Sequence, residues 1–195
     1  MPETEPSLDA VLADARACTV CAGLPLGPLP LVRASASARL LIISQAPGTR
    51  AHARGLSFDD PSGDRLRDWL GMDRDVFYDE ARVAIMPMGF CYPGRLPRGG
   101  DAPPRPECAP LWHAPIISAM PEIRLTLYVG SYAIRAFVPG YRTMTDAVAD
   151  WRTHSPDSLP LPHPSWRTNG WEKKNTWFTT ALLPELRKRL GDLGL

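Results

Sequence analysis

Four short runs of apolar residues have the composition of buried β-strands. They lie at residues 39–44, 83–86, 125–129 and 159–163. The first three are dominated by aliphatic side chains, as is typical of parallel strands that are covered on both faces. The fourth contains two prolines, which cannot donate to a strand ladder, so we predict that it lies at an edge or an end of the sheet.

Segments with helical spacing separate these strands. Residues 7–16 have a predicted N-cap at Ser7, and residues 62–70 have one at Ser62 and a stop at Gly71. Further helices are predicted at residues 111–120, 131–137, 144–152 and 182–190. Alternating strands and helices predict an α/β fold, here a three-layer α/β/α sandwich with a central, mostly parallel four-stranded sheet. We expect the 195 residues to form a single domain.

Composition narrows the classes of protein that remain. No apolar run is long enough to span a bilayer, and the N-terminal residues lack the charged and apolar regions of a secretion signal. We therefore expect a soluble, cytoplasmic protein that does not bind membranes. The net charge of +1 provides no overall attraction to nucleic acid, so such binding would depend on local basic patches.

Turn residues and polar side chains gather where the predicted strands end. These segments are residues 45–48 (QAPG), 87–94 (PMGFCYPG), 129–133 (VGSYA) and 163–167 (HPSWR). The carboxyl ends of parallel strands share one edge of a sheet, and ligands bind there in open α/β sheets. The sequence therefore predicts an active site at this edge.

All four cysteines lie in or beside loops rich in proline and glycine, where thiolates can converge on one ion or cluster. They are Cys18, Cys21, Cys91 and Cys108. The close first pair is typical of zinc sites, but zinc sites usually repeat it, and the second pair here is sixteen residues apart. A wide second pair suits a [4Fe–4S] cluster equally well. The cysteines could also form disulfides, which need an oxidising compartment, or be inert buried thiols. The spacing alone does not decide between zinc and iron–sulfur.

Four segments together resemble the uracil-DNA glycosylase superfamily, and the resemblance covers nearly the whole chain. Residues 45–48 look like its first motif, 55–58 (GLSF) like the segment with its base-stacking phenylalanine, 130–133 like a phosphate-contacting turn and 163–165 like its final motif. Each segment alone would recur by chance, whereas four in this order are specific. The cysteine spacing is similar to that of the iron–sulfur branch, often called family 4. The resemblance thus favours a [4Fe–4S] cluster over zinc.

The resemblance implies roles in base excision for two side chains. Such an enzyme flips its target base out of the duplex into a tight pocket, where Phe58 would stack on the base. His163 would donate a hydrogen bond to uracil O2 as the base leaves as an anion. Without the motifs, Phe58 would be taken for a core residue and a lone histidine for a structural one.

Contacts with the DNA backbone are implied for residues near the last two strands. Ser131 and Ser165 would bind phosphates on either side of the site, although both hydroxyls could instead serve as ordinary helix caps. Either Trp166 or Arg167 would fill the gap that the flipped nucleotide leaves. Lys173 would reach a backbone phosphate and make binding depend on salt.

This chain departs from the superfamily pattern at the position of the catalytic acid. Classical members have an Asp after the first motif residue, where this chain has Ala46. Asp59, Asp60 and His52 are the nearest replacements. We expect either that one aspartate orients the water while the other caps the turn before the following proline, or that the reaction is driven mainly by stabilisation of the leaving group. Asp59 is slightly preferred.

Base recognition also departs from the pattern, because no Asn follows the second strand. We expect backbone groups around Gln45 and around Met88, Gly89 and Phe90 to contact the base instead. Gly48 stands where some members have a bulky Tyr, so the pocket would admit larger bases.

These features together predict a monomeric DNA glycosylase that hydrolyses the N-glycosidic bond of deoxyuridine. Its partner would be uracil-containing DNA, single- or double-stranded. Two rival functions remain: a catalytically weak or silent relative that binds nucleic acid, or a glycosylase for another deaminated or modified base. A zinc-stabilised module unrelated to DNA would belong to a third class.

Overall fold

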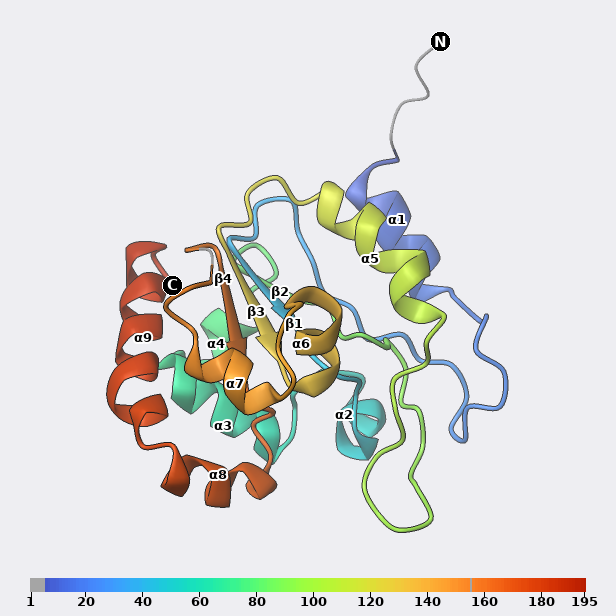
Figure 1. Cartoon of the computed structure of the whole chain (residues 1–195). Coiled ribbons are helices and arrows are strands. Elements are labelled where there is room, and N and C mark those ends of the chain that lie inside the picture. The colour runs from blue at the N-terminus through green and yellow to red at the C-terminus, as the bar shows by residue number, and fades with distance from the viewer. Residues whose placement is uncertain (1–5, 155) are drawn as a thin grey trace.

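The computed structural model describes residues 6–154 and 156–195 and has a parallel sheet at its centre (Figure 1). Its strands are β1 Leu40–Ile43, β2 Val83–Ile85, β3 Leu125–Val129 and β4 Ser158–Leu161. The described strands form a four-stranded sheet in the order β2-β1-β3-β4, and every neighbouring pair is parallel. The predicted α/β fold is confirmed, as is the edge position of the proline-containing strand β4.

Helices connect these strands. They are α1 Leu8–Arg16, α2 Thr49–Arg54, α3 Pro61–Leu70, α4 Arg74–Phe77, α5 Cys108–Ser118, α6 Ser131–Phe137, α7 Met144–Ala149, α8 Asn169–Lys174 and α9 Leu183–Asp192. A 3₁₀ turn occupies Trp166–Thr168, and a π-helical turn, Phe178–Leu182, leads into α9. The longer helices follow the predictions to within a few residues, whereas α2, α4 and α8 were not predicted. None of the helices in the described residues combines the length and the hydrophobicity needed to cross a bilayer.

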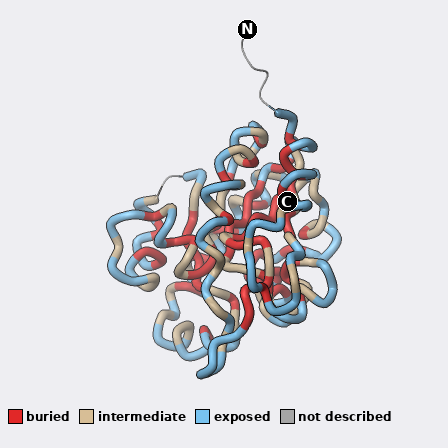
Figure 2. The backbone as a smooth tube through the Cα atoms, turned by 90° about the vertical axis from the view of Figure 1, so that its right-hand side faces the viewer, coloured by how far each residue is buried: buried red, intermediate tan, exposed pale blue. Residues whose placement is uncertain are grey.

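The two faces of the sheet bury different sets of helices, which makes three layers. Leu40 and Ile42 face a core formed with α3, α4, α7 and α9. Leu41 and Ile43 face a second core formed with α1 and α5. Buried segments run through the middle of the molecule and exposed ones surround them (Figure 2). Because β1 is covered on both faces, its continuous apolar composition follows from its position.

The start of α3 differs from the prediction. Asp60, rather than Ser62, is the N-cap: its Oδ1 accepts a hydrogen bond from the N–H of Gly63 at 2.9 Å. Pro61 follows as the first helical residue, where its missing N–H costs nothing and its restricted φ suits the helix. The helix therefore starts one residue earlier than predicted, and the cap lies beside the candidate site.

Strand order changes direction next to β1, since β2 lies on one side of it and β3 on the other. Ligand sites of open α/β sheets form where the order reverses, outside the carboxyl ends of the strands. The segments after β1, β2 and β4 all reach this place, and it contains the pocket described next.

Candidate active site

A pocket of about 70 Å³ lies at the carboxyl ends of the strands. It is lined by Ser44, Ala46, Pro47, Gly48, Ala51, Ser57, Phe58, Asp60, Ser62, Pro87, Asp101 and His163. Residues from three strand ends therefore converge with the segment before α3 and with one residue of the long loop that precedes α5. Of the side chains predicted from the sequence, the pocket brings together Ala46, Gly48, Phe58, Asp60 and His163.

Phe58 is held in a backbone conformation that non-glycine residues rarely adopt, with φ of 61°. Its ring is 8% exposed and packs edge-on against Phe77, so it belongs to the core and also forms a wall of the pocket. Gly63 makes the conformation possible: a Cβ at that position would lie 1.7 Å from the carbonyl oxygen of Phe58. Strain of this kind persists where surrounding packing imposes it, often at functional sites.

The two consecutive aspartates after Phe58 face different surroundings. Asp59 Oδ1 lies 2.9 Å from Arg74 Nη1, and its Oδ2 lies 3.0 Å from Arg54 Nη1. The hydrogen bond from Arg74, assisted by Arg54, lowers the pKa of Asp59. Asp59 does not line the pocket, whereas Asp60 does. One carboxylate oxygen of Asp60 caps α3, and the other, Oδ2, is directed toward Gly48. The geometry thus reverses the slight preference for Asp59 over Asp60.

His163 follows β4 and reaches the pocket across Gly130, the residue that ends β3. A Cβ on Gly130, whose φ is 89°, would lie 3.3 Å from Cβ of His163, so only glycine suits this contact. The carbonyl of His163 accepts hydrogen bonds from the N–H of Ser165 at 2.8 Å and from the hydroxyl of Thr168 at 2.5 Å. Burial lowers the pKa of His163, while the charges of Asp60 and Asp101 partly oppose this effect.

The segment after β2, which was predicted to contact the base through its backbone, is hydrogen-bonded to the end of β1. The N–H of Met88 donates to Ser44 at 2.8 Å, and that of Gly89 donates to Gln45 at 3.1 Å. Both donors are therefore used in fastening this segment to the end of β1. Among the residues that line the pocket, only Pro87 comes from this segment. Gln45, Met88, Gly89 and Phe90 are not among the lining residues of the pocket.

An open groove of about 1230 Å³ adjoins the pocket. It is lined by Gly48, Thr49, Arg50, Asp60, Pro61, Ser62, Arg65, Arg95, Asp101, Pro164, Trp166 and Asn169. Arg50 and Arg95 on its walls can contact phosphates, whereas the guanidinium of Arg65 is paired with Glu172 at 2.5 Å. Trp166 is 74% exposed at its edge and lies against the guanidinium of Arg167, 5.4 Å from the ring centre.

The other predicted DNA contacts, Ser131, Ser165, Arg167 and Lys173, do not line this groove. Ser131 begins α6 directly after Gly130, beside His163. Ser165 is the N-cap of the 3₁₀ turn, and its carbonyl accepts a hydrogen bond from Arg65 at 3.0 Å, which ties the turn to α3. Lys173 is exposed in the last turn of α8.

Comparison with known protein families identifies the superfamily of the chain that forms this pocket and groove. A family model described as the uracil DNA glycosylase superfamily matches residues 32–187. The chain belongs to this superfamily. The match runs from before β1 to the middle of α9 and therefore includes every segment that lines the pocket. Cys18 and Cys21 lie before it. The branch within the superfamily is not resolved by this match.

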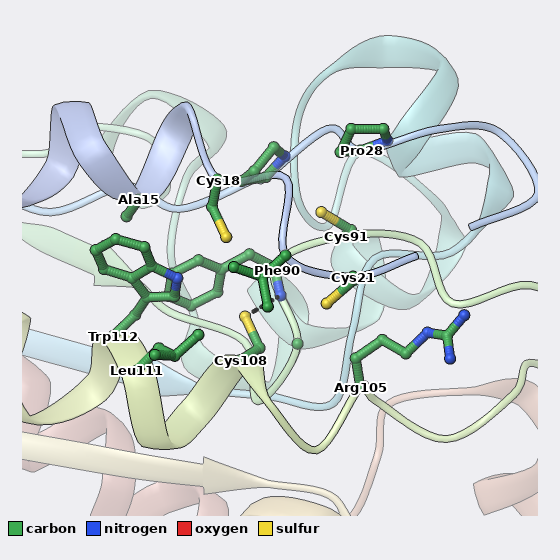
Figure 3. Close-up of a pocket in the computed structure, with 13 residues that line it drawn as sticks. Ala15, Cys18, Cys21, Pro28, Phe90, Cys91, Arg105, Cys108, Leu111 and Trp112 are labelled. Atoms are coloured by element: carbon green, nitrogen blue, oxygen red, sulfur yellow. Dashed lines mark hydrogen bonds between the residues drawn. The ribbon is translucent and has the colours of Figure 1, made fainter. Parts of the chain in front are cut away.

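The four cysteines of this superfamily member surround one separate hollow. Cys18 and Cys21 follow α1, Cys91 lies after β2, and Cys108 begins α5. Figure 3 shows the four sulfur atoms directed into the same space, and a hydrogen bond from the N–H of Phe90 to Cys108 Sγ at 3.3 Å. The hollow and the base pocket have no lining residue in common among those described.

The thiols influence one another's pKa values. Burial raises the pKa of Cys108 to about 12, and the charges of Cys21, Cys91 and Cys18 act in the same direction. Burial likewise raises the pKa of Cys91. In an apolar hollow, each thiolate makes ionisation of the neighbouring thiols less favourable. The thiolates are therefore stable together only when a bound cation balances their negative charge.

The donor set fits an iron–sulfur cluster by its chemistry. All four ligand atoms are sulfurs, the walls are largely apolar, and an N–H group donates to one sulfur, a contact that stabilises cluster thiolates. Within the described residues, no group of three or more His, Cys, Asp or Glu side chains is placed to hold a single metal ion. The thiols are free, with Cys108 buried and the other three half-buried.

Asp101 is the main site residue that the sequence did not indicate. It lies in the long loop between β2 and α5, which is rich in proline and glycine and was predicted only as turns. The three serines of the pocket, Ser44, Ser57 and Ser62, were also not assigned to it. No local signal marks Asp101, because its place depends on how the loop folds back over the end of β1.

Proposed function

We propose that this protein is a DNA glycosylase that hydrolyses the N-glycosidic bond of deoxyuridine in DNA, with a structural [4Fe–4S] cluster on its four cysteines. The observation that carries the proposal is the pocket with Phe58 and His163, which opens directly into a groove that carries three arginines. Superfamily membership supports a glycosylase acting on uracil or modified bases.

The pocket has the groups that base excision requires. Phe58 offers a ring face for stacking, a contact that contributes about 1–3 kcal/mol per base. His163, kept neutral by its surroundings, donates a hydrogen bond to the base oxygen on which negative charge develops. Burial keeps the imidazole neutral against the charges of Asp60 and Asp101, and a neutral ring N–H is a sufficient donor for this role.

Backbone contacts would keep the target strand in the groove. Arg50 and Arg95 lie on its walls and can neutralise phosphates, so binding would weaken as salt rises. The exposed Trp166 is the better placed of the two predicted wedges, because its ring projects at the groove edge with Arg167 packed against it. Ser131, Ser165 and Lys173 remain proposed phosphate contacts.

Cys18, Cys21, Cys91 and Cys108 would hold the cluster. Its role would be structural, since the cysteine hollow shares no wall with the base pocket. Residues 18–21 would be joined to both ends of the long loop, which runs from Cys91 to Cys108. The cluster would thereby brace a loop that reaches the active site.

The proposed activity is tested with end-labelled oligonucleotides that contain a single uracil. Excess protein is incubated with single- and double-stranded forms, and abasic sites are cleaved with alkali. We expect strand cleavage at the uracil position and none in the thymine control. Hypoxanthine and xanthine substrates test the pocket's width, which Gly48 leaves open. Bound but uncleaved oligonucleotides for every base would identify a silent DNA-binding relative instead.

The proposed cluster is tested on anaerobically purified protein. We expect absorbance at about 400 nm, together with iron and acid-labile sulfide in stoichiometric amounts relative to the protein. Stoichiometric zinc without iron would exclude the cluster.

A further inference from the structure

The base pocket and the groove meet at a shared rim formed by Gly48, Asp60, Ser62 and Asp101. If the proposed function is correct, a flipped nucleotide has its base in the pocket and its phosphates in the groove. Its deoxyribose joins the two and must therefore lie at the rim. The glycosidic bond that breaks is consequently flanked by Gly48 and by the side chains of Asp60, Ser62 and Asp101.

Two carboxylates face this rim from opposite elements. A Cβ on Gly48 would lie 3.7 Å from Oδ2 of Asp101 and 3.9 Å from Oδ2 of Asp60. Asp60 uses its other oxygen to cap α3. Among the described residues, by contrast, no hydrogen bond or ion pair occupies the carboxylate of Asp101. Both oxygens of Asp101 are thus available to a water molecule.

The loop that carries Asp101 has a defined shape. Asp101 forms an antiparallel bridge with Arg95, the N–H of Leu96 donates to Gly100 at 2.9 Å, and the N–H of Ala102 donates to Gly94 at 2.8 Å. This small hairpin belongs to the lime-green loop that extends beyond the sheet in Figure 1. The hairpin lies between Cys91 and Cys108 in sequence, and both of these cysteines line the same hollow.

We propose that Asp101 is the catalytic carboxylate of this enzyme. It takes over the role of the aspartate that classical superfamily members have at the position of Ala46. Asp101 holds a water molecule beside C1′ of the deoxyribose and accepts its proton as the water oxygen bonds to C1′. The bond from C1′ to the base nitrogen breaks, and its electron pair leaves with the base while His163 donates to the base oxygen. The base anion then takes a proton from solvent, and Asp101 returns its proton to solvent. Asp60 contributes a second negative charge that stabilises the oxocarbenium-like sugar.

Substitution of Asp101 tests this role. We expect Asp101→Asn to reduce the single-turnover rate on the uracil substrate by about 100-fold or more, within the range of general-base contributions. The dissociation constant for uracil-containing DNA should stay the same or decrease, because a negative charge beside the groove is lost. Asp192→Asn, which removes the same charge from exposed α9, is the matched control and should retain the wild-type rate.

Chemical rescue separates catalysis from loop structure. In Asp101→Gly, added formate supplies a carboxylate and should restore the rate at least tenfold, without an effect on the wild type. A full rate in Asp101→Asn, or a loss in Asp101→Gly that formate does not restore, would overturn the role of Asp101 while leaving the glycosylase proposal intact. A wild-type protein that releases no base from any substrate would overturn both.

Discussion

His163 owes its chemical state to its neighbours in the fold. It packs against Gly130, its carbonyl is bound by the N–H of Ser165 and the hydroxyl of Thr168, and its ring faces the pocket. Burial disfavours the imidazolium more than the charges of Asp60 and Asp101 favour it, since the pKa of His163 is lowered overall. A neutral donor of fixed orientation is what a departing base anion requires.

Replacement of His163 by alanine should therefore affect chemistry much more than binding. The loss of one donor to developing negative charge costs about 2–4 kcal/mol in kcat, so we expect His163→Ala to reduce the single-turnover rate at least tenfold. DNA affinity rests on phosphate contacts and should change only a few-fold, as measured by filter binding or fluorescence anisotropy. An equal loss of rate and affinity would mean that His163 supports the fold.

The lowered pKa of His163 also predicts how stability depends on pH. In the unfolded chain the imidazole takes up a proton below its ordinary pKa of 6.5, whereas the folded protein takes it up only at lower pH. The unfolded state then binds more protons, so stability decreases as the pH falls below about 6.5 and levels off below the folded-state pKa. His163→Gln should lose less stability than the wild type between pH 7.5 and 5.5 in urea titrations. An identical decrease in both proteins would contradict this assignment.

At the scale of single elements, the N-terminus of α3 connects the core with the site. Asp60 caps the helix and reaches the rim, Phe58 precedes it in a strained conformation, and Gly63 in its first turn leaves room for the Phe58 carbonyl. Arg67, a turn further along α3, is 3.4 Å from the same carbonyl oxygen. One helix start therefore sets both the wall and the rim of the pocket.

A pair of glycine substitutions tests this arrangement. Gly63→Ala would force a methyl group into the Phe58 carbonyl and should reduce the free energy of unfolding by more than about 3 kcal/mol, beyond ordinary overpacking. Gly170→Ala in α8 has nothing within 4 Å of the new Cβ and should stabilise by about 0.5–1 kcal/mol. Both values come from urea denaturation, and equal effects at the two positions would refute the proposed constraint.

Across the whole molecule, the cysteine hollow joins segments that are distant in sequence. The segment after α1 meets the loop between β2 and α5, and α1 itself packs against α5 on one face of the sheet. The same loop contains Asp101 at the rim of the pocket. The cysteine hollow and the candidate active site are therefore linked by one segment of backbone, residues 91–108. The two hollows remain separate, so this connection acts through the backbone of the loop.

Loss of a cysteine ligand should consequently loosen the N-terminal segment. If a cluster is bound there, Cys18→Ser should lower the Tm of the loaded protein and speed limited proteolysis within residues 19–30, because metal binding is coupled to folding. Chelation of the wild type should produce the same change, and the variant should show no further effect after chelation. A Tm difference that persists unchanged in the metal-free proteins would assign the effect to packing of the thiol itself.

The sequence by itself determined the architecture and the location of the site. Aliphatic runs, glycine stops and the prolines of residues 159–163 are local signals, and each depends on neighbours that are near in sequence. They were sufficient for the strands, the longer helices and the edge position of β4. The order of four short motifs indicated the superfamily, which the match to residues 32–187 shows. His163 and Phe58 were found because motifs marked them.

Only the tertiary structure decided how the polar groups are used. The sequence places Asp59 and Asp60 side by side, but the two arginines that bind one of them come from α2 and α4. Those helices are too short to be stable alone and form only when packed, so local propensity does not indicate them. The approach of Asp101 to Gly48 likewise depends on the fold of a long loop over a distant strand. Side-chain direction and long-range contact are properties of the packed chain, which is why the rim of the pocket could not be derived from the order of residues.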